Sequence, residues 1–208
     1  MKQALILANG KPPSKRLFKN FLAPADWFIC ADGGANTAAR FGCAPDLIIG
    51  DLDSIEKKTI AVFSNVDVKN LKDQNSTDLE KALTAAIRKK CKEIVVLGAT
   101  GGRLDHALGN LSALAKFSGK VQITFIDDIG KFIAVHRSIE FSLPAGTIIS
   151  LLPLTRCSGI VTHGLKWNLK NESLELGVRE STSNVIVSST ANIKVRKGSL
   201  IVFVMTHN

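Results

Sequence analysis

Short apolar runs alternate with segments of helical period over the first 126 residues. In Asp78–Lys90, apolar residues recur every three or four positions, as in an amphipathic helix. The pattern predicts strands at Gln3–Leu7, Trp27–Ala31, Leu47–Ile49, Val66–Lys69, Glu93–Leu97 and Val121–Ile126. It predicts helices at Ala35–Phe41, Glu56–Phe63, Asp78–Lys90 and Arg103–Phe117. This alternation indicates an α/β domain, a mostly parallel sheet with helices on both faces.

The pattern changes after Asp128, where short alternating runs continue without a helical period. Strands are expected at Ile133–His136, Ile148–Leu152, Gly159–Thr162, Val185–Val187, Ile193–Val195 and Leu200–Val204. Turn residues such as Pro144-Ala145-Gly146 separate them. We therefore predict two domains, an α/β domain over residues 1–128 and an antiparallel β-sandwich over residues 129–208.

Composition is that of an ordinary soluble protein, with 45% hydrophobic and 22% charged residues among 208. No apolar run is long enough to span a bilayer, and the apolar stretch after Met1 is too short for a secretory signal. The four cysteines are widely spaced and form no Cys-x-x-Cys pair, which favours reduced thiols. We expect a cytoplasmic protein without a membrane partner.

The formal net charge of +9 raises the possibility of a nucleic-acid partner. The lysines are scattered, however, and the chain has no tyrosine and no basic stripe interleaved with aromatic residues. We predict no nucleic-acid binding, because a basic surface that gathers a small polyanion accounts for the charge.

Two carboxylates, Asp51 and Asp53, follow the apolar run Leu47–Ile49 where a buried strand is expected to end. In an open parallel sheet, ligands bind at that carboxyl end. Carboxylates this close repel each other, and a hard cation such as Mg²⁺ removes the conflict while sharing its ligands with substrate phosphates. An isolated Asp-x-Asp would be explained better by a solvated turn.

Four further polar clusters fall at predicted strand-to-helix junctions. They are Asn9-Gly10, Asp32-Gly33-Gly34-Ala35-Asn36, Asp73-Gln74-Asn75-Ser76-Thr77-Asp78 and the stretch from Gly98 to His106. Each has an ordinary explanation: Thr77 or Asp78 as a helix cap, the glycines as turn residues, Arg103 and Asp105 as a surface ion pair. Together they predict one crevice, because the carboxyl ends of parallel strands share one edge of the sheet.

The familiar nucleotide-binding signatures are missing. No Gly-x-x-x-x-Gly-Lys-Ser/Thr loop occurs, and no Gly-x-Gly-x-x-Gly follows the first strand. A nucleotide would have to be held by cation-bridged carboxylates, glycine-loop amides and Arg103.

The ordered motifs resemble the thiamine pyrophosphokinase family from about residue 5 to about residue 204. They are Ala31-Asp32-Gly33-Gly34-Ala35-Asn36, Gly50-Asp51-Leu52-Asp53-Ser54-Ile55, Asp73-Gln74 with Thr77-Asp78, Gly101-Gly102-Arg103-Leu104-Asp105, Gly164-Leu165-Lys166-Trp167-Asn168-Leu169 and Ser181-Thr182-Ser183-Asn184. The resemblance implies transfer of the terminal pyrophosphoryl unit of ATP to the hydroxyl of thiamine, with AMP released. It also implies an N-terminal α/β domain, a C-terminal β-sandwich, and a homodimer that binds thiamine where subunits and domains meet.

The resemblance also assigns roles to residues. The predicted catalytic residues are Asp32, Asp51, Asp53, Asp78, Arg103 and Asp105, and the predicted Mg²⁺ ligands are Asp51, Asp53 and Asp78. The predicted residues for binding ATP or thiamine are Asn9, Gly10, Gly33, Gly34, Gln74, Thr77, Gly101, Gly102, Trp167, Ser183 and Asn184. Arg103 suits phosphate oxygens, and the Trp167 ring suits a thiazolium cation or an aminopyrimidine. The alternative for Trp167 is a place in the sandwich core.

Two other functions remain open on the sequence. A different pyrophosphoryl or nucleotidyl transferase would use the same aspartates on another acceptor. A nucleotide- or thiamine-sensing module would bind its ligand without turnover.

Overall fold

The computed structural model describes residues 1–206 and divides the chain into two compact units. The first comprises Met1–Ala113 and Lys120–Asp128, and the second comprises Leu114–Gly119 and Ile129–Asn208. Within the described residues, no helix is both long enough and apolar enough to cross a membrane.

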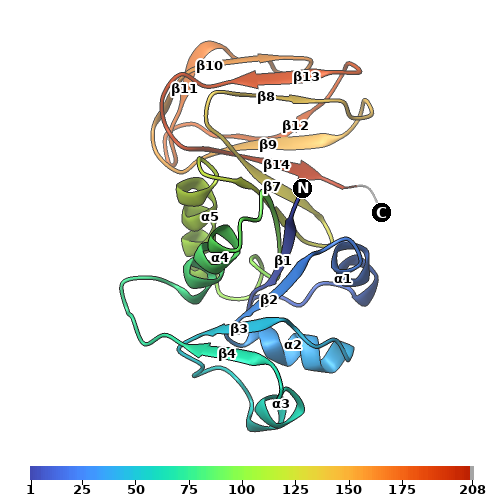
Figure 1. The fold of residues 1–208 in the computed structure, drawn as a ribbon. Helices are drawn as coiled ribbons and strands as arrows, with labels where there is room; N and C mark the ends of the chain where they lie inside the picture. Colours follow the sequence, from blue (N-terminus) through green and yellow to red (C-terminus); the bar gives the residue numbers. More distant parts are fainter. Residues whose placement is uncertain (207–208) are drawn as a thin grey trace. The chain divides into compact units, whose positions relative to one another are not determined.

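The first unit alternates strands and helices along the chain (Figure 1). Its elements are β1 (Gln3–Leu7), α1 (Lys15–Leu22), β2 (Trp27–Ala31), α2 (Gly34–Phe41), β3 (Leu47–Gly50), α3 (Lys57–Val62), β4 (Asp67–Asn70), α4 (Asp78–Arg88), β5 (Glu93–Leu97), α5 (Leu104–Phe117), whose end is grouped with the second unit, and β6 (Gln122–Ile126). The strands of this unit lie side by side in the order β6-β5-β1-β2-β3-β4, and all of these neighbours pair in parallel. The predicted mostly parallel sheet is confirmed.

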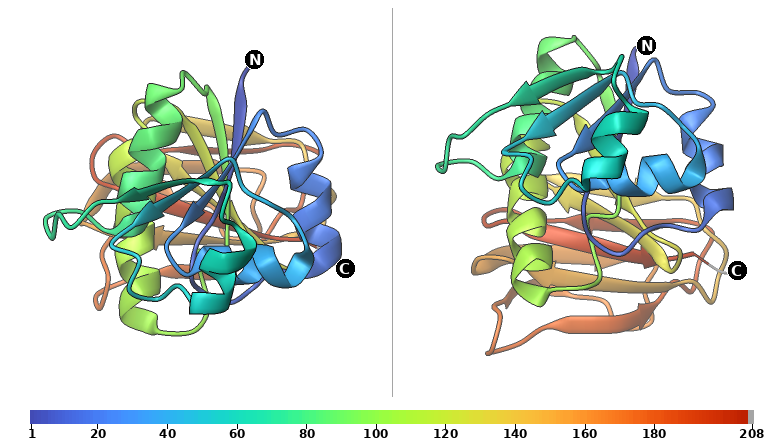
Figure 2. Two further views of the ribbon diagram at one scale, coloured as in Figure 1. Left: turned by 60° about the horizontal axis from the view of Figure 1, so that its bottom comes forward. Right: turned by 90° about the horizontal axis from the view of Figure 1, so that it is seen from below.

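Helices cover both faces of this sheet. In Figures 1 and 2, α4 lies on one side, and α1, α2 and α3 lie on the other. Strands β1, β2, β3 and β5 are almost entirely buried, as expected of parallel strands packed on both faces. Strand order reverses at β1, which lies between β2 and β5, so a crevice is expected at the carboxyl ends of β1 and β5.

Helix α1 was missed by the sequence pattern. Ser14 caps it, accepting a hydrogen bond from the backbone N–H of Leu17 (3.2 Å). Only Phe18 is fully buried, and its ring packs against Phe28 and Phe41 (centroids 5.4 and 5.1 Å apart). A short, basic helix that buries one residue gives too weak a period to recognise.

The second unit consists of two antiparallel sheets. Its strands are β7 (Gly130–Val135), β8 (Ser138–Phe141), β9 (Ile148–Pro153), β10 (Cys157–His163), β11 (Lys170–Leu174), β12 (Ser181–Val185), β13 (Ala191–Lys194) and β14 (Leu200–Met205). One sheet has the order β12-β9-β14-β7 and the other β11-β10-β13-β8. Buried residues of both sheets, such as Ile149 and Ile193, share one core, which confirms the antiparallel character predicted for this part of the chain.

Candidate active site

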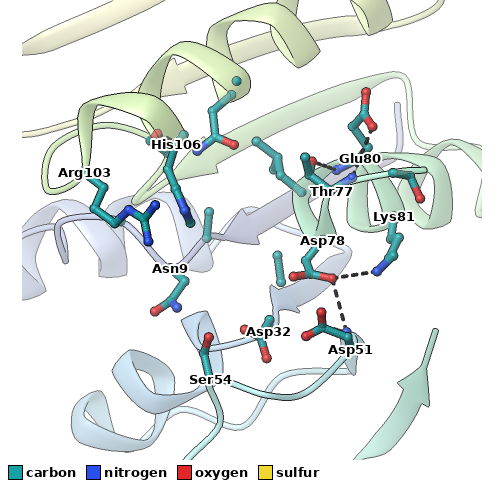
Figure 3. Close-up of a pocket in the computed structure, with 18 of the residues that line it drawn as sticks. Asn9, Asp32, Asp51, Ser54, Thr77, Asp78, Glu80, Lys81, Arg103 and His106 are labelled. Carbon is teal, nitrogen blue, oxygen red and sulfur yellow. Dashed lines mark hydrogen bonds and ion pairs between the residues drawn. The ribbon is translucent and has the colours of Figure 1, made fainter. Parts of the chain in front are cut away.

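A pocket of about 1000 Å³ lies within the first unit. Its walls are the loops after β1, β2, β3 and β5, the segment before α4, and the first turns of α4 and α5. Of the residues predicted for this unit, it is lined by Asn9, Gly10, Asp32, Asp51, Asp53, Gln74, Thr77, Asp78, Gly101, Gly102, Arg103 and Asp105. The side chains drawn in Figure 3 therefore come from loops far apart in sequence that meet at one edge of the sheet.

The loops after β1 and β5 are joined by backbone hydrogen bonds. The N–H of Gly10 donates to the carbonyl of Gly98 (2.7 Å), and the N–H of Lys11 donates to that of Thr100 (3.0 Å). A Cβ on Gly10 would overlap the Gly98 carbonyl oxygen, so only glycine permits this approach. Gly101 and Gly102, both with φ of 75°, continue the loop along the pocket.

Gly33 and Gly34 do not line the pocket. They begin α2, where a Cβ on Gly34 would overlap the carbonyl oxygen of Leu7 and one on Gly33 would overlap the side-chain amide of Asn9. Glycine is needed at both positions because α2 packs closely against the end of β1. Their predicted contact with a ligand stays a prediction.

Three carboxylates that line the pocket lie close together. Asp32, Asp51 and Asp78 each offer an oxygen within 4.8 Å of the others. Asp32 is only 4% exposed, and within residues 1–206 no hydrogen-bond donor reaches its buried Oδ1. Its φ of 43° is left-handed, a conformation that is uncommon outside glycine and is often found at functional sites.

The electrostatics of Asp32 fit a bound cation. Its pKa is raised above the usual aspartate value, chiefly by burial; hydrogen bonds from Ser54 and the Gly33 backbone oppose the rise, and the charges of Asp78 and Asp53 add to it. Gly50 makes the convergence possible, because a Cβ there would lie 2.9 Å from Asp32 Cβ and 3.1 Å from Asp78 Oδ1. A hard divalent cation would satisfy the orphaned oxygen and relieve the repulsion, so these residues fit such an ion.

Asp53 lies in the same pocket but outside the three-carboxylate cluster. Its Oδ1 accepts a hydrogen bond from Ser54 Oγ (2.9 Å), and its backbone N–H donates to Asp51 Oδ1 (3.3 Å). The cluster therefore contains Asp32 besides two of the predicted ligands. The ligand role of Asp53 stays a prediction.

Asp78 is held at the start of α4. Thr77 forms a capping box with Glu80: its Oγ1 accepts from the Glu80 N–H (3.3 Å), and its own N–H donates to Glu80 Oε2 (3.2 Å). Asp78 Oδ1 accepts from Lys81 Nζ (2.9 Å) and from the Asp51 N–H (3.2 Å). Thr77 therefore caps the helix, which was its ordinary explanation from the sequence, and it also lines the pocket.

Arg103 and Asp105 form a two-pronged ion pair at the start of α5. Arg103 Nε donates to Asp105 Oδ1 (3.1 Å) and Nη2 donates to Oδ2 (2.6 Å). The bonds from Arg103 lower the pKa of Asp105 to about 2. Both side chains are exposed, so the pair holds the guanidinium plane at the pocket rim rather than stabilising the fold.

In the second unit, Trp167 and Asn184 line a smaller pocket of about 280 Å³, and Ser183 does not. Trp167 is 57% exposed, so it is not a core residue of the sandwich. Asn184 is buried and holds the Trp167 backbone: its Oδ1 accepts from the Trp167 N–H (3.2 Å), and its Nδ2 donates to the Trp167 carbonyl (2.8 Å). The backbone N–H of Ser183, at φ 55°, donates to Ser150 Oγ (3.0 Å).

Comparison with known proteins identifies the family. A thiamin pyrophosphokinase catalytic domain matches residues 18–125, and a thiamin pyrophosphokinase vitamin B1 binding domain matches residues 135–200. Thiamine pyrophosphokinase 1 of Oryza sativa subsp. japonica is 34% identical over 199 residues, which cover 79% of this chain and 74% of that protein. This chain belongs to the thiamin pyrophosphokinase family. It is accordingly an enzyme, a transferase of the kinase type.

Other thiamine pyrophosphokinases agree with this placement. The protein of Bacillus subtilis (strain 168) is 30% identical over 182 residues, which cover 84% of this chain and 85% of that protein. A crystal structure of the Bacillus subtilis enzyme superposes with a TM-score of 0.81 at 27% identity and full coverage of both chains. That from Candida albicans superposes with a TM-score of 0.85, covering 99% of this chain and 90% of that chain, and at 18% identity it shows the fold alone.

The thiamin pyrophosphokinase pocket also includes residues to which the sequence reasoning assigned no role, among them Lys81. Lys81 follows Asp78 by three positions on the predicted helix, a spacing that places the two side chains together and could have revealed the pair. Ser54 and Asn110 also line the pocket. Asn110 Nδ2 donates to the Ala99 carbonyl (2.8 Å). The two residues are 11 positions apart, and no local sequence pattern predicts this contact.

Proposed function

We propose that this enzyme transfers the pyrophosphoryl group of ATP to the hydroxyl of thiamine, giving thiamine diphosphate and AMP. The thiamine oxygen forms a bond to the β-phosphorus while the bond from that phosphorus to the oxygen bridging it to the α-phosphorus breaks. The hydroxyl proton must leave, and either a carboxylate or a phosphate oxygen can accept it. The observation that carries the proposal is the buried, unpartnered Asp32 Oδ1 within the carboxylate cluster.

The first unit is the proposed site for ATP and Mg²⁺. Asp32, Asp51 and Asp78 would hold the cation, with Asp53 beside them in the same pocket. When bound, the cation neutralises charge on the phosphate oxygens, which is the main requirement of this type of transfer. The amides of the Gly101-Gly102 loop and the Arg103 fork, held in its plane by Asp105, would orient the polyphosphate.

The second unit is the proposed site for thiamine. The exposed face of Trp167 is available for stacking on the thiazolium or pyrimidine ring, and Asn184 keeps its backbone in place. Lys166 Nζ lies 4.7 Å from the centroid of that ring, so a cationic ligand would have to displace this ammonium. We also propose a cytoplasmic homodimer, on the family resemblance alone.

The test is AMP formation from Mg·ATP by the purified protein, with and without thiamine, with the product identified by mass. Thiamine-dependent AMP release and a thiamine diphosphate mass are expected. AMP release that requires another acceptor would replace thiamine in the proposal. Saturable ATP binding without AMP under all conditions would indicate a sensing module.

A further inference from the structure

Lys81 differs from the other cationic side chains that line the carboxylate pocket. Lys11 and Arg103 are exposed, and Arg103 is paired with Asp105. Lys81 is only 6% exposed, and its ammonium lies 2.9 Å from Asp78 Oδ1. A lysine this buried requires a fixed anion beside it, so the pair is a built feature of the site.

The contact with Lys81 restricts how Asp78 can act. Oδ1 of Asp78 accepts from both Lys81 Nζ and the Asp51 N–H, and in Figure 3 both dashed lines start at that one oxygen. The second oxygen points away from Lys81 in the same view. Lys81 thereby occupies one oxygen of Asp78 and leaves the other for a ligand.

Lys81 also changes the charge of the cluster. More carboxylates than cations line the pocket, namely Asp32, Asp51, Asp53, Asp73, Asp78, Glu80 and Asp105 against Lys11, Lys81 and Arg103. With Lys81, the cluster of Asp32, Asp51 and Asp78 becomes formally neutral when one divalent cation binds. Without Lys81 it would remain negative and would repel a polyphosphate.

We propose that Lys81 is a positioning residue that acts through Asp78 as a permanent counter-charge of the cation site. Its charge weakens binding of the bare cation and keeps the loaded cluster neutral, so that the nucleotide's phosphates are accepted. The inference rests on the proposed cation site. A purely structural lysine would instead affect folding and would leave cation affinity unchanged or reduced.

The test compares Lys81→Met, Lys81→Gln and Lys81→Arg with Lys57→Met, which removes the same charge from an exposed position on α3. Mn²⁺ binding without nucleotide is followed by the electron paramagnetic resonance signal of free Mn²⁺. We expect Lys81→Met to bind Mn²⁺ about tenfold more tightly, because a like charge near the ion has been removed. Lys81→Gln keeps a donor for Asp78 Oδ1 but no charge, so it should behave like Lys81→Met and serves as the second variant if methionine disturbs packing.

Lys81→Arg and Lys57→Met serve as controls, and the KM for Mg·ATP is the second measurement. Lys81→Arg and Lys57→Met should bind Mn²⁺ like the wild type, and the KM for Mg·ATP should rise about tenfold only in the two uncharged Lys81 variants. Mn²⁺ affinity that is unchanged or weaker in both uncharged variants would overturn the inference while leaving the cation site standing. A wild-type protein without saturable Mn²⁺ binding would overturn the cation site and the inference together.

Discussion

The two pockets of this enzyme use their polar groups in opposite ways. In the first unit, Asp32 is buried with one oxygen unpartnered, and the carboxylates around it repel one another. In the second unit, the side-chain amide of the buried Asn184 is hydrogen-bonded to the backbone of Trp167, and the Trp167 ring is exposed. The first pocket is therefore suited to bind a cation, whereas the second presents an aromatic ring whose backbone is held in place.

The two sites also differ in how they affect the stability of the ligand-free protein. The carboxylate cluster is destabilising without a ligand, because charge is buried and the single ammonium of Lys81 offsets only part of the repulsion among three carboxylates. The backbone of Trp167 is hydrogen-bonded to Asn184, and its ring is 57% exposed. Substitutions in one pocket should affect the binding of its own ligand and not that of the other. If both are affected alike, the comparison is wrong.

The largest effect is expected from Asp51→Asn. It removes one charge from the cluster without changing the shape of the side chain, and we expect turnover to fall at least about a hundredfold. The measurement is AMP formation together with Mn²⁺ affinity, and an unchanged unfolding temperature excludes a folding defect. Asp53→Asn is the matched variant: it should also reduce turnover strongly, but it should weaken nucleotide-free Mn²⁺ binding less than Asp51→Asn. Near-wild-type turnover in Asp51→Asn would contradict the proposed cation site.

A smaller and more selective effect is expected from Trp167→Ala. Loss of stacking and cation–π attraction should raise the KM for thiamine about tenfold, corresponding to about 1–2 kcal/mol, and should leave the KM for ATP unchanged. Initial rates with each substrate varied in turn provide the measurement. Trp167→Phe, which keeps an aromatic face, should lose less. Equal losses for both substrates would show that Trp167 supports the fold instead.

The smallest effect concerns stability. The raised pKa of Asp32 means that ionisation in the folded state costs free energy, a cost present in full above the folded pKa and removed as the pH falls below the usual aspartate value. Asp32→Asn should therefore raise the unfolding temperature of the cation-free protein by about 2–4 °C at neutral pH, with the gain shrinking toward pH 4. Asparagine tolerates the left-handed backbone, so strain is unchanged. A destabilised Asp32→Asn protein at neutral pH would show that this carboxylate is satisfied in the folded state.

Much of the fold could be predicted from local pattern. Strands β1, β2 and β5 were predicted with the bounds that the structure has, because apolar runs of about five residues flanked by turn residues favour buried strands over helices. Polar edge strands such as β8 and β11 were missed, since Ser138–Phe141 and Lys170–Leu174 bury few side chains. Edge strands gain their structure from a neighbour, which the local sequence does not name.

By itself, the sequence determined the alternation of strands and helices, the change of character near residue 128, and the aspartates and glycines expected to meet at one edge of a sheet. Only the tertiary structure decided which of them meet. It joined Asp32 to Asp51 and Asp78, buried Lys81 against Asp78, and turned Gly33 and Gly34 away from the pocket into helix packing. The physical reason is that periodicity is a property of neighbouring residues, whereas convergence, burial and an unpartnered oxygen depend on chain segments that meet only in the folded sheet.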